Sequence, residues 1–429
     1  PVLCKFDEKY LNLPPEVLIT CLKKKQKCFA VKDLNGKLTN YFIGIRNGKS
    51  EKQDVVRQGY QKVVVARLSD AEFFYDNDVK KSFESSIERL KGLVFRKEIG
   101  TVYEKLARIK KLAVFINKEN NLQEQENKIN KVVDLSKTDL VSEMVFEYPE
   151  LQGIMGRIYA SAAGEPSDIS QALEQHYYPL SASGALPESV LSAIVSLADK
   201  TDTLTACFSV GLEPSGSADP YGLRRTAIAI VRIVREFMPE ADLEKIIDEA
   251  LNNLPEKIKE ADSFKTAKDR LVKFFWNRIE NICENEGFKF DEVQCVVVAG
   301  RKSGIKSLGD IKLKLEALQN LRKEPSFESV TTVFKRANNI LNQAKKQNIQ
   351  IAQTVNKDLL KEDAEQKLYE KYSLIDTELS NLLENKNYSD AVKKLIEIKP
   401  FLDSFFETVM VMCEDENLKL NRIALINYI

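Results

Sequence analysis

The sequence predicts a mainly α-helical, multidomain protein. Apolar residues recur with a period of about 3.6 residues through most of the chain, which is typical of amphipathic helices. Residues 308–429 are almost free of glycine, and strand and turn signals concentrate in residues 1–66. We expect an α+β segment at residues 1–66, a helical bundle at 67–262, a connecting segment at 263–312 and a helical domain at 313–429.

Residues 1–66 combine strand and turn signals. The apolar segments 27–32 and 38–45 flank the pair Asn35-Gly36, and an Asn-Gly pair between two such segments strongly favours a β-hairpin. The chain starts abruptly and without methionine. We therefore expect these residues to be the remaining part of an α+β domain in a fragment or processed chain.

The helical pattern begins near residue 66. It is clearest in residues 79–93, 101–117, 129–146, 189–205 and 223–237, with loops predicted at 181–184 and 214–220. In the stretch EMVFEYPELQGIMGR (residues 143–157) the pattern runs into Tyr148-Pro149 and restarts at residues 151–159. Taken alone, this stretch favours a kinked helical hairpin in a core.

The C-terminal part continues the helical pattern. A helix is predicted at residues 264–283, followed by an apolar run at 293–299 and a basic turn at 301–306. Within the segment VFKRANNIL (residues 333–341), helical spacing predicts that Phe334, Ala337 and Leu341 are buried. The polar residues between these anchors are then exposed.

Composition excludes several protein classes. The hydrophobic content of 43% and charged content of 30% are ordinary for a soluble protein, and no apolar run reaches the roughly 20 residues of a membrane helix. Seven cysteines without a C-x-x-C pair favour reduced thiols over a disulfide framework or a zinc site.

The net charge is zero, but basic segments at 1–67 and 301–360 flank an acidic one at 134–260. Solvated helix faces produce such a pattern, and so does an RNA held at separated points.

Several segments, in order along nearly the whole chain, resemble the β subunit of bacterial heterotetrameric glycyl-tRNA synthetases. The longest is residues 143–157, continued by GEP (164–166) and EQHYYP (174–179). The others are residues 14–20, 26–29, 65–75, 197–204, 211–225, 334–341 and 409–417, with Asn421-Arg422.

This resemblance implies a fold and a function. It implies an HD-domain-like helical bundle at 67–262, a helical anticodon-binding domain at 313–429 and a further N-terminal region absent here. The expected function is binding of glycine tRNA for aminoacylation by a separate catalytic α subunit, in a cytoplasmic α2β2 assembly. ATP and magnesium would be used by that α subunit, and we expect no cofactor in this chain and no DNA or membrane partner.

The sequence offers no catalytic residue that we can recognise. It lacks a Gly-rich phosphate loop, a G-x-S-x-G motif and an H-E-x-x-H motif. HD phosphohydrolases need several histidines beside aspartates, whereas this chain has one histidine, His176. We therefore expect no metal site, with Asp199 and Asp202 acting as caps or as ion-pair partners of Lys200, Arg224 or Arg225.

Two sets of residues are candidates for RNA contacts. The loop and helix start at residues 211–225 suit a phosphate, although Asp219 capping a helix with Pro220 in its first turn fits equally well. Polar groups on the helix at 333–341 suit unstacked base edges, although a solvated helix face is the simpler interpretation of that pattern alone. The predicted phosphate contacts are Arg224, Arg225, Arg301 and Lys302, and the predicted anticodon contacts are Lys335, Arg336, Asn338, Asn339 and Arg422.

Two other functions remain open from the sequence. One is a degenerate HD-fold phosphohydrolase with a regulatory role, and the other is a helical scaffold for protein interactions. Nucleotidase or phosphodiesterase activity with added divalent metal would favour the first. Binding of a protein partner without affinity for tRNA would favour the second.

Overall fold

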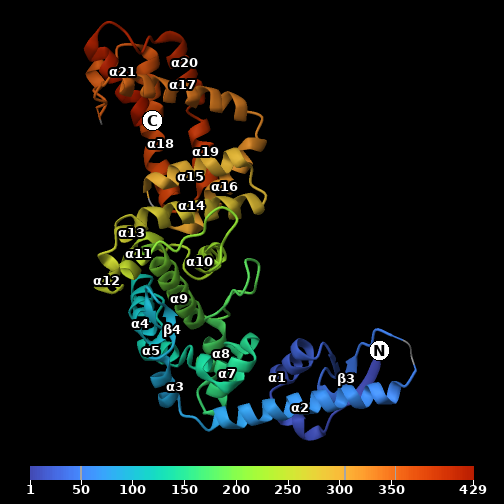
Figure 1. The fold of residues 1–429 in the computed structure, drawn as a ribbon. Helices are drawn as coiled ribbons and strands as arrows, with labels where there is room; N and C mark the ends of the chain where they lie inside the picture. Colours follow the sequence, from blue (N-terminus) through green and yellow to red (C-terminus); the bar gives the residue numbers. More distant parts are fainter. Residues whose placement is uncertain (49–50, 304–305, 353) are drawn as a thin grey trace. The chain divides into compact units, whose positions relative to one another are not determined.

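A computed structural model describes residues 1–429 except 49–50, 304–305 and 353, and except the side chains of 302 and 303. The chain divides into two compact units, Pro1–Ile279 and Glu280–Ile429. Helices dominate both units, as predicted, and Figure 1 shows the strands gathered near the N-terminus and beside α4.

The first unit begins with a small antiparallel sheet in the order β1-β3-β2. Its strands are β1 (Val2–Lys5), β2 (Phe29–Lys32) and β3 (Leu38–Gly44). The side chain of Asp33 accepts the backbone N–H groups of Asn35 and Lys37, both at 2.9 Å, and Gly36 takes the left-handed conformation at φ +82°. The predicted hairpin is therefore confirmed.

Helix α2 (Gln53–Val79) is the longest helix in this part of the chain and runs past the sheet (Figure 1). It contacts β1 and the turns η1 (Glu8–Asn12) and η2 (Cys21–Lys25), next to α1 (Pro15–Thr20). The predicted boundary at residues 66 and 67 falls inside α2. The finer division into four domains stays a prediction.

The core beneath α2 combines two distant parts of the chain. It contains buried side chains from residues 2–71 and others from residues 144–155. The second group lies on α6 (Glu143–Glu147), η4 (Pro149–Leu151) and α7 (Ile154–Ala162), so the predicted break at Tyr148-Pro149 is confirmed. Tyr148 is fully buried there.

Helix α9 (Val190–Ser209) is the centre of the remaining helices of this unit. All its residues except Val190, Lys200 and Thr203 are buried, because α4, α5, α8, α10 and α11 pack against it. The surrounding elements are α3 (Phe83–Leu90), β4 (Val94–Arg96), β5 (Gly100–Thr101), α4 (Val102–Glu119), α5 (Glu126–Leu135), α8 (Ser167–Gln175), α10 (Leu223–Phe237), α11 (Leu243–Asn252), α12 (Glu256–Lys259), α13 (Asp262–Lys265) and α14 (Ala267–Asn285). Whether this group has the topology of an HD domain stays a prediction.

One expected helix is interrupted. The pattern at residues 129–146 predicts a single helix, but α5 ends at Leu135 and the chain continues through Ser136 and Lys137 into η3 (Thr138–Val141). Ser136 is extended and Lys137 is left-handed, with φ +66°. The spacing of apolar residues does not reveal such a break, because the helices on both sides of it keep their apolar faces toward the core.

The second unit is built from helices alone in its described residues. These are α15 (Phe290–Ser303), α16 (Leu308–Lys323), α17 (Phe327–Lys346), η5 (Lys357–Leu359), α18 (Asp363–Glu384), α19 (Tyr388–Ile396), α20 (Lys399–Thr408) and α21 (Glu416–Tyr428). The apolar side chains of α17, α18, α20 and α21 form one core around Phe405 and Leu368. Within the described ranges, no helix is both long and apolar enough to cross a membrane.

Candidate RNA-binding helix and a buried charge network

A network of buried charges joins α4, α9 and the break before η3. Lys105 Nζ lies 2.8 Å from Asp199 Oδ1 and 3.0 Å from Asp202 Oδ2. Arg108 binds Asp202 with two hydrogen bonds, from Nε at 2.7 Å and from Nη2 at 3.1 Å. These four side chains are almost entirely buried, so each charge depends on the others for solvation.

Lys137 enters the network from the opposite side. Its Nζ lies 2.6 Å from Asp199 Oδ2 and 3.8 Å from the centre of the Tyr177 ring. A left-handed backbone costs a non-glycine residue about 1–3 kcal/mol. Burial lowers the pKa of Lys137, and the ion pair with Asp199 only partly opposes that shift. Burial disfavours the Asp199 carboxylate, yet Lys105 and Lys137 hold its pKa well below the usual value.

His176 is buried at the end of α8 and remains neutral. Its Nε2 accepts from the Lys137 ammonium at 3.0 Å, so Nδ1 carries the proton and donates to the carbonyl of Leu173 at 2.9 Å. Burial and the neighbouring Lys137 lower its pKa well below the usual value. The histidine thus supports Lys137.

The structure corrects the predicted partners of Asp199 and Asp202. The two residues share one face of α9, as expected, because both bind Lys105. Their partners, however, are Lys105, Arg108 and Lys137 rather than Lys200, Arg224 or Arg225. No group of three or more His, Cys, Asp or Glu side chains within the described ranges is placed to hold a metal ion.

The sequence contained a signal for two of these missed residues. Lys105 and Arg108 follow Val102 at spacings of three, so they lie on the same stripe as buried Leu112. A charged pair on the apolar face of a helix requires buried counter-charges. Lys137 could not be placed in this way, because α5 ends at Leu135 where the sequence predicts an unbroken helix.

A pocket of about 410 Å³ opens beside the network. Lys200 lines it, and its ammonium donates to Ser196 Oγ at 2.8 Å and to the carbonyls of Tyr177 and His176 at 3.1 and 3.2 Å. Burial, with the positive charges of Lys137 and Lys105, lowers the pKa of Lys200 to about 7. Arg225, predicted to bind phosphate, is exposed and also lines this pocket.

The loop before α10 is held by a capping carboxylate. Asp219 accepts the backbone N–H groups of Leu223 at 2.8 Å and of Arg224 at 3.0 Å, so it caps the helix as one of the two interpretations predicted. Pro220 does not lie in the first turn, because α10 begins at Leu223 after Gly222 in the left-handed conformation. Arg224 Nη2 donates to the carbonyl of Gly216 at 2.5 Å, which closes the loop.

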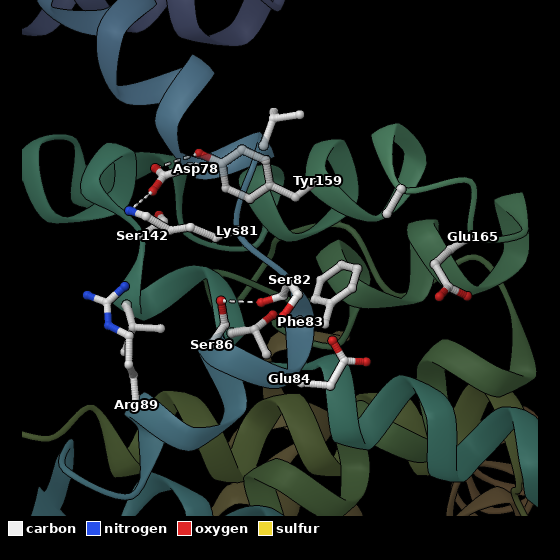
Figure 2. A pocket seen from close by; sticks show the side chains of 14 residues that line it. Asp78, Lys81, Ser82, Phe83, Glu84, Ser86, Arg89, Ser142, Tyr159 and Glu165 are labelled. Carbon is white, nitrogen blue, oxygen red and sulfur yellow. Dashed lines mark hydrogen bonds and ion pairs between the residues drawn. The ribbon is translucent and has the colours of Figure 1, made fainter.

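A second pocket, of about 280 Å³, lies between α2, α3 and α7. Asp78 accepts the backbone N–H groups of Glu143 and Met144 at 3.1 and 3.0 Å and the hydroxyl of Tyr159 at 3.0 Å. Figure 2 shows Asp78 and Tyr159 joined on one side of the pocket, close to Lys81. Asp78 thus supports the start of α6.

The second unit presents the predicted polar face on α17. Lys335, Arg336, Asn338 and Asn339 are all exposed and Ala337 is buried, so the prediction is confirmed for the polar residues and for one of the three apolar anchors. Phe334 and Leu341 are half-buried against the core. Arg336 Nη2 donates to the carbonyl of Phe406 at 2.9 Å, and its guanidinium lies 4.9 Å from the centre of the Phe406 ring.

The remaining candidates differ in exposure. Arg422 is 6% exposed, and it donates to the fully buried Glu365 and to the carbonyl of Met410. We therefore replace its expected RNA contact with a structural role, because its guanidinium is used inside the domain. Arg301 forms an ion pair with Glu280 at the surface, and the side chain of Lys302 lies outside the described residues.

Two family models match parts of the chain. The family model described as "Glycyl-tRNA synthetase beta subunit" matches residues 1–298, and "DALR anticodon binding domain" matches residues 330–429. The second match contains the exposed face of α17.

Curated relatives agree with these family models. Proteins named "Glycine--tRNA ligase beta subunit" are 35% identical over 429 residues in Desulfatibacillum aliphaticivorans, 38% over 426 in Syntrophus aciditrophicus and 37% over 431 in Desulforapulum autotrophicum. The alignments cover 99–100% of this chain and 60–61% of the relatives, so the chain spans about three fifths of their length. The chain belongs to the family of glycyl-tRNA synthetase β subunits.

Proposed function

We propose that this chain is the tRNA-binding part of a glycine–tRNA ligase β subunit. It holds glycine tRNA while a separate α subunit joins glycine to the tRNA with ATP, releasing AMP and diphosphate. The family match over residues 1–298 supports this role, together with an anticodon-binding domain at 330–429. We further propose an α2β2 assembly in the cytoplasm, with ATP and magnesium bound by the α subunit alone.

The exposed face of α17 carries the proposal. Four polar side chains project from a helix whose opposite face is packed into the core of its unit. The contact of Arg336 with Phe406 fixes the guanidinium before RNA arrives, which reduces the entropy lost on binding. Amide and guanidinium groups are suited to hydrogen bonds with the edges of unstacked bases.

The phosphohydrolase alternative is less well supported. Oxygens of both Asp199 and Asp202 are held by ammonium and guanidinium groups, which repel a divalent cation. The scaffold alternative has no specific observation in its favour.

Specificity for the anticodon provides the test. Losing one polar base contact costs about 1–3 kcal/mol, by analogy with base readout in DNA. We expect Arg336→Ala and Asn339→Ala to narrow the affinity gap between glycine tRNA and a tRNA with altered anticodon cytosines. Lys367→Ala and Asn381→Ala, at exposed positions of α18, are matched controls that should leave the gap unchanged.

The titrations are run at several salt concentrations with both tRNAs. Equal loss of affinity for both tRNAs would make α17 a phosphate clamp without a role in base recognition. No loss for either tRNA would place the recognition surface elsewhere and reject the assignment of α17.

A further inference from the structure

The pocket beside the charge network has a large excess of basic groups. Its lining includes one carboxylate, that of Asp199, and five basic side chains, namely Arg96, Lys105, Lys137, Lys200 and Arg225. Asp199 is already shared by Lys105 and Lys137. Three basic side chains, Lys200, Arg96 and Arg225, therefore face the pocket without a counter-ion among the residues that line it.

Lys200 shows the cost of this excess. Its three hydrogen-bond acceptors are a hydroxyl and two carbonyls, none of which is charged. Its pKa is lowered by burial and by the charges of Lys137 and Lys105, and Asp199 only partly offsets them. A bound anion would supply the missing negative charge and would keep the ammonium protonated.

Arg96 and Arg225 are also available to a ligand. In the described part of the chain, neither has a carboxylate within ion-pair distance. The guanidinium of Arg96 lies 4.3 Å from the centre of the Tyr221 ring, and its Nε is buried without a hydrogen-bond partner. Arg225 lies against Gly222, where an added Cβ would stand 2.7 Å from Nη2, so glycine leaves room for the guanidinium.

The rest of the lining is apolar and aromatic. Phe95, Leu140, Pro179, Leu180 and Tyr221 contribute to it. A volume of about 410 Å³ falls within the range of small-molecule sites. The pocket therefore has room for an organic group next to its basic side chains.

We propose that this pocket binds a phosphate monoester, with the phosphoryl group held by Arg96 and Arg225 close to the charge of Lys200 and the attached organic group against the apolar wall. Guanidinium and ammonium groups are the side chains that bind phosphate most strongly. The phosphate belongs either to a free small ligand or to the 5′ end of an RNA. The proposal does not depend on tRNA binding by α17.

Calorimetric titration of the whole chain tests the phosphate requirement. We expect adenosine 5′-monophosphate to bind and adenosine to bind at least about tenfold more weakly, since hydrogen bonds to charged groups contribute about 1.5–3 kcal/mol. Arg225→Gln and Lys200→Met should each weaken binding of the monophosphate by a similar factor. Lys111→Met, at an exposed position of α4, should leave the affinity unchanged. Equal binding of adenosine and its monophosphate, or unchanged affinity in either variant, would reject the site.

Folding does not confound this test. Arg225 is exposed and has no ion-pair partner in the described part of the chain, so Arg225→Gln should fold normally. The fluorescence of buried Trp276 checks the fold of Lys200→Met. If the monophosphate binds Arg225→Gln as it binds the original chain, the basic pocket is not its site.

Proton uptake gives a second readout. The charged groups that act on Lys200 are Asp199 on α9, Lys137 before η3 and Lys105 on α4, while His176 at the end of α8 is neutral. Binding at pH 8 should take up a proton, measured in two buffers of different ionisation enthalpy. Lys200→Met should abolish the uptake, and uptake that persists would exclude Lys200 as the responding group.

Competition distinguishes the two sources of phosphate. If glycine tRNA with a 5′-phosphate displaces adenosine 5′-monophosphate and dephosphorylated tRNA does not, the RNA end is the ligand. If neither tRNA displaces the monophosphate, a free phosphate ester is the ligand. Either result retains the pocket as a phosphate site, and failure of every phosphate monoester to bind rejects it.

Discussion

The buried network around Asp202 predicts a large loss of stability from a nearly isosteric substitution. Asp202→Asn removes the charge that holds Lys105 at 3.0 Å and Arg108 at 2.7 and 3.1 Å. Breaking a buried ion pair from one side costs about 3–5 kcal/mol, because the remaining charges stay uncompensated. Asp168→Asn, which breaks an exposed ion pair with Lys128 in the same unit, should cost at most about 1 kcal/mol.

Urea unfolding followed by tryptophan fluorescence measures this difference. Trp276 is the only tryptophan and is buried in the first unit, so its signal reports the unit that contains the network. In the double variant Asp202→Asn with Lys105→Met, part of the lost stability should return, because one unpaired cation is removed. A loss in Asp202→Asn no larger than in Asp168→Asn would refute the conclusion that Asp202 holds a desolvated cation pair.

Three further predictions concern stability and metal content. Arg422→Met should lower the stability of the second unit by about 3–5 kcal/mol, because it leaves Glu365 unpaired. The tRNA affinity per folded molecule should not change. A specific loss of tRNA affinity in folded protein would restore Arg422 as an RNA contact. Because the pKa of Lys200 is lowered, the folded state binds fewer protons than the unfolded state above pH 7. This group should therefore raise the free energy of unfolding with pH, by at most about 1.4 kcal/mol per pH unit up to about pH 10. Lys200→Met should flatten that slope in urea titrations, and an unchanged slope would assign it to other groups. Chelators should leave the thermal midpoint of unfolding and the tRNA affinity unchanged, since basic side chains already bind Asp199 and Asp202. A stoichiometric divalent ion found by elemental analysis would contradict this.

Local patterns in the sequence predicted local structure well. The Asn35-Gly36 hairpin and the exposed polar face of α17 follow from interactions within a few residues, namely turn geometry and helical spacing. The same applies to the break at Tyr148-Pro149, where proline restricts the residue before it.

The partners of the buried charges could not be predicted from local patterns. Asp202 binds Lys105, which is 97 residues away in sequence, and no local pattern selects that lysine over the nearby Lys200. The break at Lys137 involves the same contacts, because its ammonium forms an ion pair with Asp199 only in the folded protein. The burial of Arg422 could not be predicted for a similar reason, since its partner Glu365 lies 57 residues away.

The composite core beneath α2 also sets an order of events during synthesis. Val17 and Leu18 of α1 share that core with Tyr148 and Met155, which the ribosome adds much later. Until those residues emerge from the exit tunnel, α1 and α2 cannot bury the apolar side chains that pack against α6, η4 and α7, so contacts between distant segments limit the rate at which this core forms. A nascent chain that stalls before residue 155 would expose this surface, and it would then be a target for chaperones or for aggregation.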